Sequence, residues 1–229
     1  MAELAPLIAV IGCDGSGKST LARDLYTRYA GRRPTELAYL GLKSGAMGNA
    51  IKRWPLIGPR FERYLSKRAA QTRDSKGKIP GLPAALVILV LSMIRKRRFE
   101  RVLAMRRAGK MVITDRYPQI EVPGFYDGPG LSAAKPDSWL VAKISRRERA
   151  LYEWMASHVP THVIRLNVDV ETALTRKPDH ARPLIEKKVE ATPRLTFNGA
   201  PITDLDATMP YDEELAVADA AVARAIDAR

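Results

Sequence analysis

Cysteine is nearly absent from this sequence, since Cys13 is the one thiol among 229 residues. A single cysteine excludes an intramolecular disulfide, and with it the class of small disulfide-rich secreted domains. It also excludes a paired-cysteine redox centre. The first ten residues carry neither the basic segment nor the cleavage site of a secretory signal. We therefore expect a cytoplasmic protein in a reducing compartment.

The chain also lacks an apolar run long enough to cross a bilayer. Its most hydrophobic segment, AALVILVLSMI, has 11 residues at positions 84–94, whereas a spanning helix needs about 20. Four basic residues follow directly, at positions 95–98. Two interpretations fit this pattern: a core helix that emerges into solvent, or an interfacial helix whose basic end lies against lipid headgroups.

Histidines are few, which limits the metal and hydrolase chemistry open to the protein. His158, His162 and His180 have no cysteine partners and do not follow the spacing of a zinc site. His158 and His162 are separated by Pro160, which prevents them from sharing a helix. No G-x-S-x-G motif is present, so a hydrolase of the nucleophile-elbow type has no support.

Acidic residues are scarce in one part of the chain, and this sets the overall charge. The formal net charge is +13, and residues 43–110 hold 18 Lys or Arg against three acids, while the rest is nearly neutral. This basic region is either a solvated helical face or a contact surface for an anionic membrane, an acidic substrate or nucleic acid. Nucleic acid is not excluded but is disfavoured as a partner, because the chain lacks the aromatic-studded basic surface expected for stacking on single strands. A membrane contact would place the protein at the inner face of the membrane.

Short apolar runs alternate with amphipathic segments along the chain. Residues 7–11 and 161–168 are typical of buried parallel strands, and residues 19–30 and 211–228 of helices. The other strands are expected at 36–40, 111–114 and 200–205, and the other helices at 60–74, 84–107, 145–157 and 170–176. We predict a single α/β domain over residues 1–229, a three-layer sandwich with a parallel sheet and helices on both faces. It would carry a basic helical insertion at about 43–110, a long loop at 118–136 and a lid at about 176–194.

A complete phosphate-binding loop follows the first strand. Residues 12–19 satisfy G-x-x-x-x-G-K-[ST], with an apolar strand before the loop and an amphipathic helix after it. The glycines let backbone N–H groups surround the phosphates, Lys18 supplies a fixed positive charge, and the Ser19 hydroxyl is a magnesium ligand. We therefore predict that ATP and Mg²⁺ are the cofactors. The predicted nucleotide-binding residues are Gly12, Cys13, Asp14, Gly15, Ser16, Gly17, Lys18, Ser19 and Thr20.

A second acidic group is expected beside the magnesium, at the end of a neighbouring strand. Asp115 ends the apolar run VITD, where such a carboxylate belongs. Arg116 follows at once and can hold an anionic substrate or the transferring phosphoryl group. Asp14 is unexpected beside bound phosphates, because a carboxylate repels them. We expect Asp14 to face the phosphoryl acceptor instead.

The loop GCDGSGKST at residues 12–20 and the Asp115-Arg116-Tyr117 triplet resemble the thymidylate kinase-like group of nucleoside and nucleotide kinases. The segment around Arg176 and Arg182, and the stretch at residues 204–207, support this resemblance. It implies the P-loop NTPase fold, with a five-stranded parallel sheet and a lid. It also implies ATP as phosphoryl donor, and such enzymes are often homodimers.

The same resemblance implies roles for individual residues. Asp14, Arg116 and Tyr117 would contact the acceptor, and Ser19 and Asp115 would hold magnesium. The catalytic set would be Lys18, Asp115, Arg116, Arg176 and Arg182, with the two lid arginines closing over ATP. The turn at residues 207–210 would lie near the adenine base.

The acceptor side departs from the thymidylate kinase pattern. The Arg-Glu-Pro-Gly segment of those enzymes is replaced here by LGLKSG at residues 40–45, and the run after Tyr117 is also different. We therefore expect a kinase for a small-molecule acceptor such as a glycan or a lipid-linked envelope intermediate. A nucleoside monophosphate (dTMP) kinase is the alternative, and a P-loop ATPase or NTP-binding regulator with an anionic partner is a third hypothesis.

Overall fold

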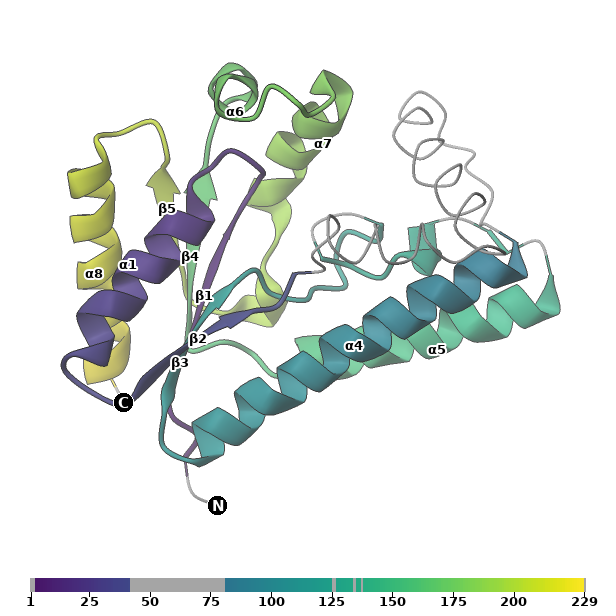
Figure 1. Cartoon of the computed structure of the whole chain (residues 1–229), viewed down its shortest axis with the longest axis horizontal. Helices are drawn as coiled ribbons and strands as arrows, with labels where there is room; N and C mark the ends of the chain where they lie inside the picture. Colours follow the sequence, from purple (N-terminus) through teal and green to yellow (C-terminus); the bar gives the residue numbers. More distant parts are fainter. Residues whose placement is uncertain (1–2, 42–80, 125–126, 134, 137, 229) are drawn as a thin grey trace.

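The computed structural model describes residues 3–41, 81–124, 127–133, 135–136 and 138–228. Within these residues, five parallel strands form one sheet in the order β2-β3-β1-β4-β5 (Figure 1). The strands are β1 (Leu7–Gly12), β2 (Thr35–Tyr39), β3 (Met111–Asp115), β4 (His162–Asn167) and β5 (Ile202–Asp206). The predicted five-stranded parallel sheet and the α/β class are confirmed.

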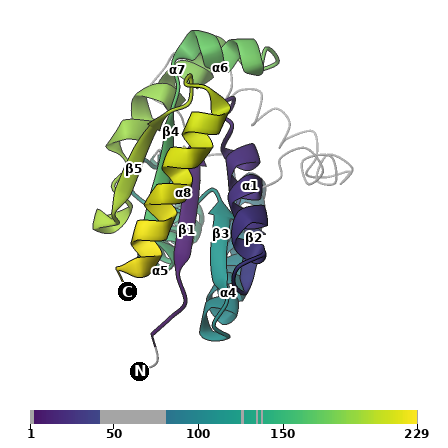
Figure 2. The ribbon, with the colours of Figure 1, turned by 90° about the vertical axis from the view of Figure 1, so that its left-hand side faces the viewer.

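Helices cover both faces of the sheet, which completes the three layers. Figure 2 shows α1 (Lys18–Ala30) and α8 (Tyr211–Asp227) in front of the strands. The opposite face is covered by α4 (Leu82–Arg107) and α5 (Trp139–Ala156), which lie side by side and extend beyond the sheet (Figure 1). Two shorter helices, α6 (Val170–Arg176) and α7 (Arg182–Ala191), lie above the carboxyl end of β4. Three single 3-10 turns complete the described elements: Leu131–Ala133, Thr192–Arg194 and Phe197–Gly199.

Strand β1 shows how the sequence produces two cores. Every residue of β1 is buried, as expected for the central strand of a parallel sheet covered on both faces. Ile8 and Val10 pack in the cluster under α1 and α8. Leu7, Ala9 and Ile11 point the other way, into the cluster under α4 and α5. This alternation follows from the two-residue period of a strand.

Helix α5 is longer than the sequence analysis predicts. It begins at Trp139, six residues before the expected start at Ser145. The Ser138 hydroxyl accepts a hydrogen bond from the backbone N–H of Val141 at 3.3 Å and caps the helix. The cap adds nearly two turns, and these turns carry Val141, which packs against Ala85 and Ile88 of α4.

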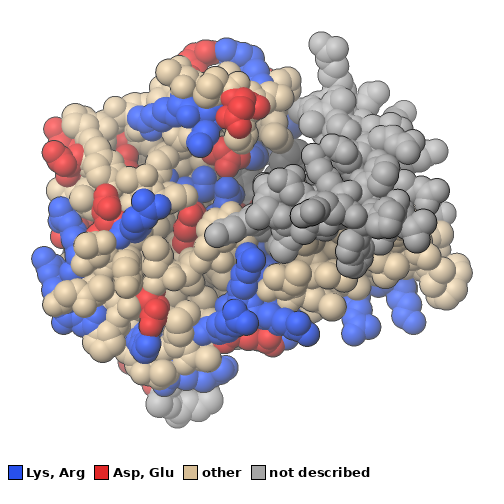
Figure 3. Space-filling view, in the orientation of Figure 1, with Lys and Arg blue, Asp and Glu red and all other residues tan. Residues whose placement is uncertain are grey.

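The basic region is only partly within the described residues. The expected helix at 60–74 and residues 42–80 as a whole lie outside them. Helix α4 is the described part, and Phe99, Val102 and Leu103 are buried against the sheet. Its first half leaves Leu86 and Val90 exposed, and basic side chains project over α4 and α5 on the face shown in Figure 3. In the part of the chain that the structure describes, no helix is both long and apolar enough to cross a membrane.

Candidate active site

The phosphate loop lies between the carboxyl end of β1 and the first turn of α1. Gly17 precedes α1 with φ 86°, a left-handed conformation that favours glycine. Gly15 has φ 87°, and a side chain there would place its Cβ 2.7 Å from the Ala173 carbonyl oxygen. No side chain caps the start of α1, so its first N–H groups face the loop. The loop is therefore shaped for an anion at the positive end of a helix dipole.

Lys18 is buried at the base of this loop, with 5% of its surface exposed. Its ammonium donates a hydrogen bond to the Cys13 carbonyl oxygen at 3.0 Å and lies 3.7 Å from Asp14 Oδ1. Burial lowers the pKa of Lys18, because a charged ammonium loses its hydration there. A phosphate beside Lys18 would restore the lost stabilisation of the charge.

Ser19 and Asp115 meet across the edge of the sheet. The parallel register of β1 and β3 sets Val10 against Asp115, which brings the end of β3 next to the loop. The Ser19 hydroxyl donates to Asp115 Oδ2 at 2.6 Å. Asp115 is 8% exposed, and its Oδ1 atom is buried with no hydrogen-bond partner. A hydroxyl and a carboxylate with one unused oxygen are the oxygen donors that Mg²⁺ prefers, so Ser19 and Asp115 could hold this ion.

Five side chains of alternating charge run from α7 to α4 through the site. We call Lys188, Asp14, Arg116, Asp127 and Arg95 the charge array. The Lys188 ammonium binds Asp14 Oδ2, and Arg116 lies between the two carboxylates, 3.0 Å from Asp14 Oδ1 and 3.4 Å from Asp127 Oδ2. Arg95 binds the other carboxylate oxygen of Asp127 at 2.5 Å. The array places two carboxylates and three cations next to the phosphate loop.

The array sets the ionisation of its members. Burial alone would raise the pKa of Asp14, but Lys188, Lys18 and Arg116 lower that pKa well below its usual range. Burial also acts against the charged form of Arg116, yet Asp127 and Asp14 raise the Arg116 pKa. Asp14 is therefore ionised throughout the neutral range. Arg116 has φ 76°, unusual for a residue with a side chain, and such backbone strain is common at functional sites.

The lid region contributes differently from the sequence expectation. Arg176 ends α6 and donates to the Gly15 carbonyl oxygen at 3.3 Å, so it reaches the loop as expected. Arg182 does not: its guanidinium binds both carboxylate oxygens of Glu171 at 2.6 and 2.8 Å and is half exposed. The cation of the predicted lid segment that reaches Asp14 is Lys188, two turns into α7. His180 Nε2 lies 3.8 Å from the same carboxylate.

Comparisons with known proteins place the chain in a family. No family model matches it. The uncharacterized ATP-binding protein YghS of Escherichia coli K12 is 47% identical over 210 residues, which cover 91% of this chain and 89% of YghS. The uncharacterized ATP-binding protein YghR of the same strain is 41% identical over 217 residues, covering 94% and 86%. The chain belongs to the YghS–YghR family.

The fold of this YghS–YghR family member is similar to that of a solved kinase structure. The structure of deoxyadenosine kinase from M. mycoides with bound dATP superposes with a TM-score of 0.51 and covers 93% of this chain and 96% of the kinase. Sequence identity is 16%, so the likeness concerns the fold. The family member has the fold of P-loop nucleotide kinases. A specific relation to thymidylate kinase is not established by these comparisons.

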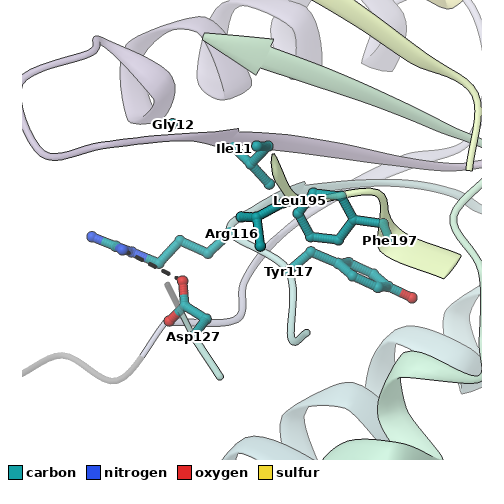
Figure 4. A pocket seen from close by; sticks show the side chains of 7 residues that line it. All are labelled: Ile11, Gly12, Arg116, Tyr117, Asp127, Leu195 and Phe197. Carbon is teal, nitrogen blue, oxygen red and sulfur yellow. Dashed lines mark hydrogen bonds and ion pairs between the residues drawn. The ribbon is translucent and has the colours of Figure 1, made fainter. Parts of the chain in front are cut away.

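The remaining predicted site residues of the family member lie within the loop or the core. Ser16 and Cys13 are buried in the loop, and burial raises the pKa of the Cys13 thiol. The Thr20 N–H donates to the Gly17 carbonyl oxygen at 2.9 Å, within the first turn of α1. Tyr117 points away from Arg116, toward Phe197, on the wall of a small cavity (Figure 4). Its hydroxyl donates to the His158 carbonyl oxygen, so the structure does not bring it to the phosphate loop.

Three residues of the charge array were missed by the sequence analysis: Lys188, Asp127 and Arg95. Lys188 had only a partial signal, because buried Ile185 is three residues from both Lys188 and Arg182 and the spacing does not say which of the two cations faces inward. Asp127 and Arg95 had none. They are 32 residues apart, and Asp127 lies in a loop without periodicity.

Proposed function

We propose that this protein is an ATP- and Mg²⁺-dependent phosphotransferase that moves the γ-phosphoryl group to a small-molecule acceptor. The hydrogen bond of 2.6 Å between Ser19 and Asp115, beside buried Lys18, is the observation that carries the proposal. If residues 12–19 formed only a glycine turn, there would be no reason to bury Lys18 together with Asp115, one of whose carboxylate oxygens has no hydrogen-bond partner. The names of YghS and YghR, which describe ATP-binding proteins, and the kinase fold support the same reading.

The donor side of the reaction follows from the loop. Lys18 and the N–H groups of α1 would neutralise the β- and γ-phosphates, and Ser19 and Asp115 would hold magnesium. Bound magnesium would offset charge on the phosphates during transfer. Positioning and charge stabilisation supply most of the rate acceleration in phosphoryl transfer, so these fixed groups would supply most of what the reaction needs from the protein. Arg176 would cover the nucleotide from α6.

The acceptor side is formed by Asp14 and Arg116. Arg116 would hold an acceptor oxygen or the transferring phosphoryl group, and Asp14 would accept a hydrogen bond from an acceptor hydroxyl. Lys188 would approach the developing charge from the lid. Closure of α6 and α7 over the loop would exclude water, so that ATP is not lost to hydrolysis.

The proposed acceptor is a glycan or a lipid-linked envelope intermediate. The departures at residues 40–45 and after Tyr117 support an acceptor side different from that of thymidylate kinases. A nucleoside monophosphate kinase is the second candidate, favoured by the nucleotide kinase fold.

The deciding experiment measures ADP release from MgATP with dTMP, the other nucleoside monophosphates, hexoses, amino sugars and a lipid extract. Stimulation by a sugar or lipid supports the first candidate, and stimulation by dTMP alone supports the second. If MgATP is neither bound nor turned over, the phosphotransferase proposal is wrong.

The lid cation gives a prediction that separates Lys188 from Arg182. Lys188→Met should lower the rate of phosphoryl transfer by about 10- to 100-fold, because a cation near the developing charge is lost. Arg182→Met should change the rate by less than about threefold, since its ion pair with Glu171 is exposed. Both variants are measured by ADP release at saturating MgATP. A larger loss of rate in Arg182→Met than in Lys188→Met would assign the catalytic role to Arg182 instead.

A further inference from the structure

The loop that follows Arg116 is anchored to α4 and α5 by two buried side chains. Arg95 of α4 donates to the Asp127 carbonyl oxygen at 2.9 Å and to its carboxylate at 2.5 Å. Glu148 of α5 accepts the N–H groups of Gly130 and Leu131 at 2.9 and 2.7 Å. These contacts fix both ends of the short stretch from Asp127 to Leu131.

The Arg95 anchor is built into the interior and leads directly to the site. Arg95 is 2% exposed, and its guanidinium also donates to the Tyr152 hydroxyl at 2.8 Å. Asp127 uses one carboxylate oxygen for Arg95 and the other for Arg116, so it is a bridge between the two arginines. Figure 4 shows the Asp127 carboxylate directed at the Arg116 guanidinium. Asp127 itself has φ 62°, a conformation that needs support from its surroundings.

We propose that Arg95 and Asp127 are positioning residues that fix the direction of the Arg116 guanidinium. Without the bridge, Arg116 would keep Asp14 as its one carboxylate partner in the array and could turn about that contact. The inference rests on the proposed phosphoryl transfer, in which Arg116 holds the reacting oxygen atoms. Arg95 does not touch those atoms, and its effect is transmitted through Asp127.

The first test is a double-mutant cycle on ADP release from MgATP, measured with dTMP and without acceptor. Asp127→Asn should lower the rate by about 10- to 100-fold, since a displaced catalytic group costs that much. Arg116→Lys/Asp127→Asn should be no slower than Arg116→Lys within about twofold, because both changes act on one group. Additive losses would overturn the proposal. Asp219→Asn is the matched control: it breaks an ion pair of 3.1 Å with Arg28, outside the charge array, and should leave the rate unchanged.

A second variant separates positioning from folding. Asp127→Asn leaves Arg95 buried without its ion pair, and this can destabilise the protein. Arg95→Met/Asp127→Asn removes both charges together, and asparagine tolerates the left-handed backbone of Asp127. We expect this pair to recover the thermal midpoint but not the rate. Recovery of the rate together with the midpoint would assign Arg95 and Asp127 a purely structural role.

Hydrogen exchange gives a reading that does not depend on turnover. In Arg95→Lys, amides of residues 116–124 should exchange about tenfold faster than in the unchanged protein, while amides of β1 keep their rates. Unchanged exchange in residues 116–124 would overturn the proposal even if the enzyme were slow. Faster exchange in Arg95→Lys, together with no turnover of MgATP by the unchanged protein, would support the anchor and refute the proposed function.

Discussion

Lys18→Ala should reduce phosphoryl transfer from MgATP by about 10²- to 10³-fold, the loss typical for one preorganised charge in a dry site. The ammonium lies at the base of the loop, within 3.0 Å of the Cys13 carbonyl oxygen, and is 5% exposed. Lys18 is the first residue of α1, so the helix fixes the place of its backbone. The change should appear in the maximal rate of ADP release at saturating MgATP.

Lys110→Ala is the matched control for this loss. Lys110 precedes β3, pairs with Glu36 at 2.6 Å, and has a side chain that is 43% exposed. Its removal should leave the rate unchanged within about twofold, because an exposed ion pair contributes little. Equal losses in the two variants would indicate a general effect of net charge. An unchanged rate in Lys18→Ala would contradict the assignment of residues 12–19 as the nucleotide site.

The donor half of the site could be predicted from the sequence because its signal is local. The residues of the phosphate loop are contiguous, and the chemistry of the loop dictates each residue type. Asp115 could be added because parallel strands end at one edge of the sheet, and its strand is apolar and short. The contact between Ser19 and Asp115 joins residues 96 positions apart, yet the loop motif was enough to place Ser19 and the end of a strand was enough to place Asp115.

The other half of the site depends on contacts that no short pattern contains. A lid rich in basic residues could be recognised by composition, but composition does not say which cation turns inward. Arg182 forms an exposed ion pair with Glu171 of α6 and therefore faces solvent. Lys188 lies at the same spacing from buried Ile185 as Arg182 does, and it turns inward to the Asp14 carboxylate. Arg95 belongs to the basic end of its helix, which was expected to meet either solvent or lipid headgroups. It is buried because Asp127 and Tyr152 give it partners.

Glu148→Ala should have the largest effect on stability among the changes considered. Glu148 is fully buried, and its carboxylate accepts three hydrogen bonds, from the Ser92 hydroxyl and from the N–H groups of Gly130 and Leu131. Removal takes away the acceptor of all three hydrogen bonds, and each such loss at a buried donor costs about 1–3 kcal/mol. We expect the free energy of unfolding in urea to fall by roughly 3 kcal/mol or more. The thermal midpoint should fall by about 6 to 12 °C, as for a domain of this size.

Glu153→Ala tests whether this loss belongs to the buried contacts or to helix α5 in general. Glu153 lies five residues later on the same helix and pairs with Arg149 at 2.8 Å, with both side chains about half exposed. Its removal should change the free energy of unfolding by less than about 0.5 kcal/mol. If both variants lose the same amount, helix propensity and charge explain the result, and Glu148 does not anchor the loop. If only Glu148→Ala is destabilised, Glu148 of α5 holds the stretch from Asp127 to Leu131 in place. The Asp127 carboxylate that pairs with Arg116 then belongs to a fixed segment.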